Sequence, residues 1–196
     1  MKIYTRTGDK GHTTLFTGKK IPKNDLLMDA IGAVDETNSA IGSALSFFPA
    51  ETNTLLPLRY QLETIQHALF DVGAALATPR TEASAAKIDK TRFDPEATKQ
   101  LEEWIDTMES TLPPLKTFIL PGGHPAGALL HLARSLCRRA ERDALPLNQR
   151  GDLSDHVLMF LNRLSDYLFV SSRFLNHQLN SPETTWQPHA PLKNPS

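Results

Sequence analysis

The sequence has one cysteine, no long apolar run and no secretory signal. Because Cys137 is alone among 196 residues, an internal disulfide and a cysteine-based zinc site are excluded, and a reducing compartment is favoured. No stretch approaches the roughly 18 uninterrupted apolar residues that would span a bilayer. The opening residues lack the apolar core of a secretory signal. We therefore expect a soluble cytoplasmic protein that is not associated with a membrane.

The sequence also lacks an excess of charge of one sign. Its 21 Lys and Arg residues nearly balance 22 Asp and Glu residues, giving a formal net charge of -1, which excludes a globally basic nucleic-acid coat protein. With 40% hydrophobic residues, the length suits one well-buried domain, which we expect over residues 1–180. Residues 181–196 carry four of the 14 prolines and are predicted to form an extended or flexible tail.

Strand patterns are nearly absent, with residues 2–5 as the one candidate, and apolar residues recur at helical spacing instead. The first predicted helix starts near Asn24 or Asp25, either a fair N-cap, and Pro49 ends it. The other predicted helices span about 55–77, 94–112, 125–145 and 154–179, and the polar residues 80–93 are predicted to be a loop. Five helices with short connections favour an all-α, antiparallel five-helix bundle.

One face of the fourth predicted helix gathers charged and polar side chains. On a helical wheel Arg134, Arg138, Glu141 and His131 lie within about 80° of one another. Arginine is always charged and offers planar pairs of donors, so a row of arginines suits phosphate or carboxylate groups. The alternative is a solvated charged face held by ion pairs between residues one turn apart.

Polar residues also interrupt helices that are otherwise apolar. Asn162, Asp166 and Arg173 form a stripe on the fifth predicted helix, where we expect them to be buried and to pair with the arginines of the fourth. The alternative is a structural network that fixes the register of the helices. On the first helix, Asp35 and Asn38 lie beside apolar residues. Such a carboxylate needs a cation, either in a structural pair or in catalysis.

The segment 5–14 combines glycines, hydroxyls and cations that could cradle a phosphate, although a flexible basic terminus is the simpler interpretation. It contains no Walker A pattern. The chain also lacks paired Glu-x-x-His motifs, His-Glu-x-x-His and Gly-x-Ser-x-Gly, which sets aside a ferritin-like di-metal centre, a zinc protease of that class and a serine-hydrolase elbow. Cys137 falls on the apolar side of its helix, which favours a packed thiol over a nucleophile.

Several segments together resemble the signatures of the PduO-type ATP:corrinoid adenosyltransferases. The three main ones are residues 5–11 (TRTGDKG), 135–142 (SLCRRAER) and 162–169 (NRLSDYLF). Residues 118–123 (FILPGG), and 34–36 (VDE) with 38–42 (NSAIG), also match. The resemblance covers residues 2–180, with the motifs in the family's order and spacing.

The resemblance implies a fold, an assembly and a reaction. The implied fold is a ferritin-like five-helix bundle, assembled as a homotrimer with active sites between subunits. The implied reaction transfers the 5′-deoxyadenosyl group of ATP to cob(I)alamin and yields adenosylcobalamin and triphosphate. Mg²⁺ is expected on the ATP phosphates. A reductase and a B12-dependent acceptor enzyme are further implied partners.

The resemblance also assigns residues by matching motif positions. The implied ATP contacts are Thr5, Arg6, Thr7, Gly8, Thr13, Thr14, Lys23, Arg138, Glu141, Arg142 and Asn162. Phe118 would occupy the lower face of the corrin and keep the base off cobalt, while Asp35 would pair across the subunit interface with Arg134. The implied corrinoid-binding residues are therefore Phe118, Asp35 and Arg134. The implied catalytic residues are the same three together with Arg138, which would contact the departing triphosphate.

Two other kinds of function compete with the enzyme. The same residues would serve a carrier that holds adenosylcobalamin and delivers it to a B12-dependent enzyme. A nucleic-acid-binding bundle built on Arg138 and Arg139 is disfavoured by the balanced charge and by the lack of exposed aromatics between basic residues. The enzyme hypothesis needs no Ser, Cys or His nucleophile, because the substrate's own cobalt(I) would attack.

Overall fold

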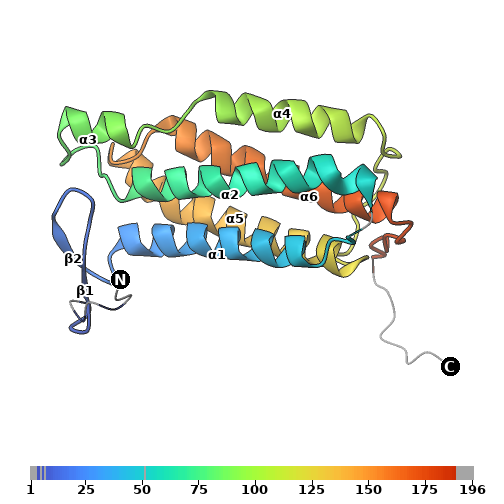
Figure 1. Cartoon of the computed structure of the whole chain (residues 1–196), viewed down its shortest axis with the longest axis horizontal. Coiled ribbons are helices and arrows are strands. Elements are labelled where there is room, and N and C mark those ends of the chain that lie inside the picture. The colour runs from blue at the N-terminus through green and yellow to red at the C-terminus, as the bar shows by residue number, and fades with distance from the viewer. Residues whose placement is uncertain (1–3, 5, 7, 51, 189–196) are drawn as a thin grey trace.

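A computed structural model of the chain describes residues 4, 6, 8–50 and 52–188. Its elements in chain order are β1 (His12–Thr14), β2 (Lys20–Pro22), α1 (Leu26–Ser46), a 3-10 turn (Asn53–Leu55), α2 (Leu56–Leu76), α3 (Ala85–Lys90), α4 (Glu96–Glu109), α5 (Pro125–Gln149) and α6 (Asp155–Gln178). Successive long helices run in opposite directions along one bundle (Figure 1). The predicted all-α five-helix bundle is confirmed, and α3 is an additional short helix at one end.

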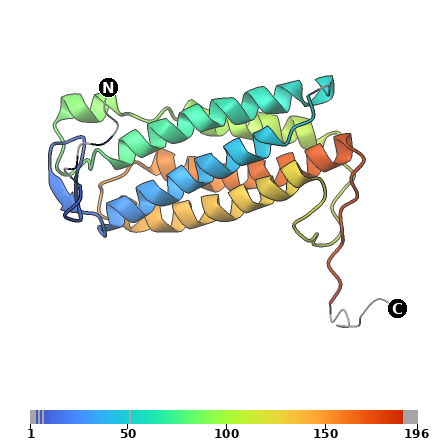
Figure 2. The same ribbon diagram turned by 60° about the horizontal axis from the view of Figure 1, so that its bottom comes forward.

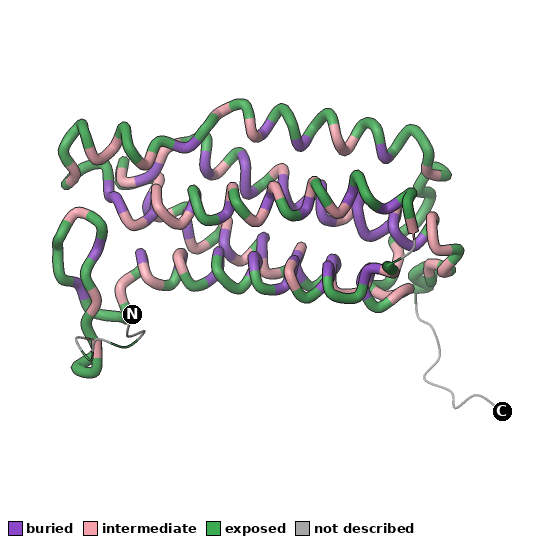
Figure 3. Tube along the Cα trace, in the orientation of Figure 1, coloured by how far each residue is buried: buried purple, intermediate pink, exposed green. Residues whose placement is uncertain are grey.

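The core lies between the long helices, where each buries one stripe of side chains (Figure 3). On α2 the buried residues recur every three or four positions, and they are Leu58, Leu62, Ile65, Leu69, Val72 and Leu76. Fully burying such a side chain stabilises the fold by about 1.5–3 kcal/mol. Helix α5 buries mainly small residues such as Ala133, Ala140 and Ala144. These leave room for α1 and α6, both of which pack directly against α5.

The predicted helix starts are confirmed at their caps. The side chains of Asp25 and Ser154 accept hydrogen bonds from the backbone N–H groups of Leu27 and His156, two residues further on. At the other end of α5 the prediction was short, because the helix continues past Leu145 through Pro146 to Gln149. A proline in the last turn of a helix removes a single backbone donor, so the final turn can still form.

The structure corrects two predictions about segments without apolar periodicity. Residues 80–93 are not all loop, since α3 forms a six-residue helix with no buried residue, which gives apolar spacing nothing to detect. Residues 12–22 form an antiparallel hairpin in which Thr13 pairs with Ile21. Leu15 and Ile21 are buried, so the hairpin is packed rather than a flexible basic terminus. Of the strand predicted at 2–5, only Tyr4 lies within the described residues, and it is not in a strand.

The hairpin and the C-terminal segment lie at opposite ends of the bundle (Figures 1 and 2). The hairpin precedes α1, and the linker before α5 lies at the far end, beside the residues that follow α6. Helix α1 has 21 residues, which corresponds to about 32 Å at 1.5 Å per residue. None of the described helices is both long and apolar enough to cross a membrane.

Candidate active site

Four of the predicted ATP contacts surround one hollow on the outside of α5 and α6. The hollow has a volume of about 300 Å³, and its lining residues are Arg138, Glu141, Arg142, Leu145, Leu158 and Asn162. The first four side chains project from successive turns of α5, and the other two come from the first half of α6. Two arginines beside an apolar wall therefore form a cationic recess that opens to the surface.

A hydrogen bond fixes one side of this recess. Asn162 Nδ2 donates to Glu141 Oε1 at 2.8 Å and so joins α6 to α5. The prediction that Asn162 and Asp166 are buried and pair with the arginines of α5 is wrong, because both are exposed and Asp166 instead accepts a hydrogen bond from Arg163 on its own helix. Helical spacing gives the direction of a side chain, but a neighbouring element is needed to cover it.

Arg138 also borders a second hollow of about 390 Å³ between α4, α5 and α6, together with Arg134 and Asp166. The Arg134 Nε atom is buried and has no hydrogen-bond partner among the described residues. Burial, with the nearby Arg138 charge as a smaller cause, lowers the pKa of Arg134 below its usual value. Arginine stays protonated under such a shift. Arg134 is thus a partly buried cation whose Nε lacks an acceptor within the described chain.

Asp35 is exposed on α1 and forms no ion pair among the described residues. The ion pair that joins α1 to α5 is instead made by the next residue, Glu36, with Arg139. Asn38, the other polar residue noted on this helix, is buried and donates to the backbone oxygen of Gln66 at 3.2 Å. Asn38 therefore has a structural role within the chain, while Asp35 stays available to a partner outside it.

Of the remaining predicted ATP contacts, Thr13 and Thr14 lie on the hairpin at one end of the bundle, and Gly8 and Lys23 flank it. Gly8 is packed so closely that a β-carbon there would lie 3.1 Å from Lys23 Nζ. Thr14 is exposed and Thr13 is half-buried, whereas the predicted contacts at Thr5 and Thr7 lie outside the described residues. The Arg6 guanidinium lies 5.4 Å from the centre of the Tyr4 ring. No hydrogen bond or ion pair of the described residues joins the hairpin to the recess on α5 and α6.

Phe118 lies in the linker at the opposite end of the bundle, with its side chain 77% exposed. The turn that follows it is held by Asn176 of α6, which accepts a hydrogen bond from His124 N and donates one to the oxygen of Gly122. Gly123 has a φ of +90°, and a β-carbon there would lie only 2.4 Å from Asn176 Nδ2. The turn therefore needs glycine both for its conformation and for its close approach to α6.

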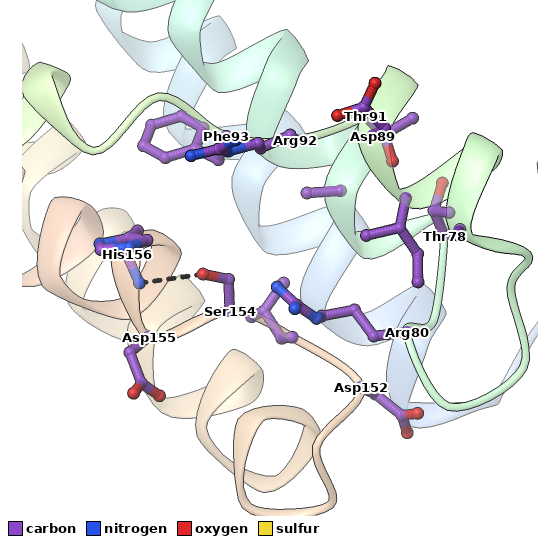
Figure 4. A pocket seen from close by; sticks show the side chains of 14 residues that line it. Thr78, Arg80, Asp89, Thr91, Arg92, Phe93, Asp152, Ser154, Asp155 and His156 are labelled. Atoms are coloured by element: carbon purple, nitrogen blue, oxygen red, sulfur yellow. Dashed lines mark hydrogen bonds between the residues drawn. The ribbon is translucent and has the colours of Figure 1, made fainter.

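Another hollow, of about 810 Å³, lies between α3, the end of α2 and the start of α6. Figure 4 shows its lining, which includes Arg80, Arg92 and His156 together with Asp89 and Asp152. It contains none of the candidate ATP-binding, corrinoid-binding or catalytic residues predicted from the sequence, and its acidic and basic groups nearly balance. Within the described residues, no group of three or more His, Cys, Asp or Glu side chains could hold a metal ion.

Comparisons with known proteins bear on the family of the chain. A family model described as cobalamin adenosyltransferase matches residues 3–175. The chain is 45% identical over 188 residues to corrinoid adenosyltransferase MMAB of Mus musculus, covering 96% of this chain and 78% of that protein. It is 43% identical over 176 residues to the Bacillus subtilis corrinoid adenosyltransferase, covering 90% and 87%. The chain belongs to the cobalamin adenosyltransferase family.

Solved structures give the same answer for the fold. A phenylalanine-to-alanine variant of the PduO-type ATP:corrinoid adenosyltransferase from Lactobacillus reuteri, complexed with cobalamin and ATP, superimposes with a TM-score of 0.85 at 38% identity. The match covers 95% of this chain and 100% of that one. An arginine-to-lysine variant of the same protein, complexed with ATP, has a TM-score of 0.83 at 39% identity. The family and enzyme class predicted from the motifs are confirmed.

In this cobalamin adenosyltransferase, sequence reasoning missed the residues that hold Phe118 in place. Asn176 is 1% exposed, and a buried amide needs hydrogen-bond partners, which could have suggested a structural role. Arg173 is only 5% exposed, as expected, but it donates to the Pro113 oxygen at 2.9 Å rather than meeting the α5 arginines. The predicted packed thiol is confirmed, because Cys137 is buried and its sulfur contacts the Leu161 oxygen.

Burial of His131 predicts that acid destabilises the fold. His131 is 3% exposed, and burial, followed by the nearby Arg134 charge, lowers its pKa to about 4 from 6.5. The unfolded chain binds this proton below about pH 6.5, but the folded chain does so only near pH 4. The contribution of His131 is therefore fully present above about pH 6.5 and is lost as pH falls toward about 4, by on the order of 3 kcal/mol.

Urea unfolding of the wild type and of His131→Phe, at about pH 7 and about pH 4.5, measures this contribution. The carboxylates titrate in both proteins, so their common effect cancels in the comparison. We expect the free energy of unfolding to fall less with acid in His131→Phe than in the wild type. Equal losses in the two proteins would contradict the assignment.

Proposed function

We propose that this protein transfers the 5′-deoxyadenosyl group of ATP to cob(I)alamin. Cobalt(I) attacks C5′ of ATP, so a cobalt–carbon bond forms while the bond from C5′ to the phosphate oxygen breaks. The products are adenosylcobalamin and triphosphate. The nucleophile belongs to the substrate, so the protein has to bind both substrates, bring C5′ to cobalt and stabilise the departing triphosphate.

The recess of Arg138 and Arg142 is the proposed seat of the triphosphate. Charge-assisted and bidentate hydrogen bonds from arginine are among the strongest that phosphate oxygens can receive. Asn162 Nδ2 donates to Glu141 Oε1 at 2.8 Å, and this hydrogen bond holds the Glu141 carboxylate toward α6. Mg²⁺ would arrive on the ATP phosphates and add further positive charge there.

The hairpin would complete this site from a neighbouring copy of the chain, in the homotrimer that we propose. Gly8, Thr13, Thr14 and Lys23 offer backbone N–H groups, hydroxyls and an ammonium, but none of them is bonded to the recess of their own chain. The linker before α5, which carries Phe118, lies at the opposite end of the bundle from the hairpin (Figures 1 and 2). One chain therefore offers the two halves of the site at separate ends, which supports active sites shared between subunits.

The Asp35→Ala variant tests this assembly. Among the described residues, Asp35 on α1 forms no ion pair and the buried Nε of Arg134 on α5 has no hydrogen-bond partner, and we propose that these two side chains meet across the subunit interface. Breaking a buried ion pair costs about 3–5 kcal/mol, because the surviving charge is stranded. We expect Asp35→Ala to weaken both the trimer and corrinoid use. The exposed Asp71 on α2 supplies the matched control, Asp71→Ala.

Sedimentation velocity at several protein concentrations reads the assembly state, and a corrinoid titration reads affinity. A wild-type protein that sediments as a monomer would refute the trimer outright. If Asp35→Ala matches Asp71→Ala in both measurements, the proposed ion pair is wrong even if the trimer stands.

Phe118 is the proposed floor of the corrin site. Its exposed ring provides apolar surface that a flat macrocycle can cover, and a ring in that position leaves no room for the lower axial base. With the base removed, cobalt(II) is easier to reduce to the nucleophilic cobalt(I), because the added electron enters a more accessible orbital. The electron itself must come from an external one-electron reductant.

The observation that carries this function is the convergence of Arg138, Glu141, Arg142 and Asn162 on one cationic recess in a cobalamin adenosyltransferase fold. The deciding experiment mixes the purified protein with chemically reduced cobalamin, ATP and Mg²⁺, and follows the absorbance of the cobalt–carbon product. Product that appears only when protein and ATP are both present supports the proposal. No product above the protein-free rate rejects it.

We also propose a cytoplasmic location, a reductase that supplies cobalt(I), and a B12-dependent enzyme that accepts the product. The support is chemical. Cobalt(I) needs a reductant to form, and adenosylcobalamin is a cofactor that another enzyme must use. The single buried cysteine is consistent with a reducing compartment.

A further inference from the structure

We propose that Trp186 is a positioning residue for Phe118, and that residues 181–186 form a strap that holds the segment 118–120 against the end of the bundle. The inference rests on the proposed role of Phe118 as the floor of the corrin site. It assigns a function to the part of the C-terminal tail that the structure describes, which the sequence predicted to be extended or flexible.

The strap pairs with the Phe118 segment like a short strand. The Leu120 N–H donates to the Thr184 oxygen at 2.8 Å, and the Trp186 N–H donates to the Phe118 oxygen at 2.7 Å. Between these two bonds, Ile119 and Thr185 form an antiparallel bridge. The backbone of Phe118 is therefore tied directly to the residue that carries the indole ring.

The strap is anchored to α6 at its other end. Asn180 turns the chain with a φ of +51°, and Ser181 N–H donates to the Asn176 oxygen at 2.9 Å. Glu183 then lies 3.5 Å from the buried guanidinium of Arg173, which also donates to the Pro113 oxygen. Arg173 thus connects the strap with the start of the Phe118 linker.

The two aromatic rings meet edge to face. Their centres are 6.3 Å apart and their planes are inclined at 82°, a geometry that aromatic pairs favour. Even with this contact Phe118 is 77% exposed, so few other contacts limit the rotation of its ring. Trp186 is itself 49% exposed, and it extends the apolar surface formed by Phe118 and Leu120. The indole therefore fixes one side of Phe118 and leaves the other open to a macrocycle.

The test compares Trp186→Ala and Trp186→Phe with the control Gln187→Ala, which changes the adjacent exposed residue of the same tail. Steady-state assays at saturating cobalamin give kcat and the KM for ATP. Absorbance and electron paramagnetic resonance of cob(II)alamin, added to the ATP-loaded protein, give the fraction that lacks its lower base. Thermal unfolding checks that each variant is folded.

For Trp186→Ala we expect kcat to fall about three- to tenfold, the size of effect that loss of one aromatic pair produces. The base-free fraction should fall with it, the KM for ATP should stay unchanged, and Trp186→Phe should recover both values. Gln187→Ala should match the wild type.

Two results would overturn the inference alone: a Trp186→Ala variant equal to an active wild type, or equal losses in Trp186→Ala and Gln187→Ala. A parallel change in the KM for ATP would also overturn it, by indicating a general structural defect. A wild-type protein that forms no cobalt–carbon product would instead overturn the proposed function, and this inference with it.

Discussion

Arg138→Ala is expected to lower the rate of adenosyl transfer by about 10²–10³, the usual cost of removing one preorganised donor from a developing negative charge. Arg138 lines the recess on α5 and α6 in which we propose that the triphosphate is bound. Its side chain is exposed, and truncating it removes no core contact. The fold should therefore survive while catalysis fails.

The measurement is single-turnover formation of the cobalt–carbon product from pre-reduced cobalamin, together with an unfolding curve for each variant. Arg150→Ala, at the exposed end of the same helix, is the charge-matched control and should react at the wild-type rate. Arg138→Lys keeps the charge without the bidentate geometry, so an intermediate rate is expected. A near-normal rate for Arg138→Ala would remove Arg138 from the mechanism.

Phe118→Ala is expected to lower turnover by about 10- to 100-fold, while binding of ATP changes little. Covering an exposed phenylalanine with a ligand is worth about 1.5–3 kcal/mol, and that energy would offset the loss of the lower axial base. The effect should be largest when the reaction starts from cob(II)alamin with a limiting reductant, because removal of the base eases the reduction. It should shrink when cob(I)alamin is supplied ready made.

Phe70→Ala is the matched control, since Phe70 is also a highly exposed phenylalanine (71%) but lies on α2. Turnover from both corrinoid oxidation states and the KM for ATP should be compared across the three proteins. If Phe118→Ala turns over at the wild-type rate at saturating corrinoid, the proposed role of Phe118 as the floor of the corrin site is refuted. Equal losses in both variants would instead indicate a nonspecific effect of truncating a surface aromatic.

Local signals were sufficient for the helices and for the family. Apolar spacing and capping residues such as Asp25 and Ser154 act within one or two turns, so they can be read without knowing the fold. The motifs around Arg138 and Asn162 were likewise enough to identify the family, and the wheel already gave the direction of the α5 arginines. Helix α3 was not predicted, because a short helix without buried residues has no stripe of apolar side chains.

Partners distant in sequence could not be predicted in the same way. The wheel grouped Asn162, Asp166 and Arg173 correctly, but which of them is covered depends on the elements packed over each turn. Only Arg173 lies beneath another segment, and its acceptors belong to residues 113 and 183. The ion pair between Glu36 and Arg139 could not be predicted for the same reason. Whether Glu36 or Asp35 meets Arg139 depends on how α1 is rotated about its axis relative to α5.

The sequence by itself determined the five helices with their starts and the arginine row of α5. It also determined the membership in the cobalamin adenosyltransferase family. All of these depend on residues that lie close together in the sequence. The tertiary structure decided that the hairpin and Phe118 lie at opposite ends of the bundle, and that the tail returns to bind the Phe118 linker. It could do so because such contacts depend on how helices of a given length and direction bring distant segments together, which no local pattern records.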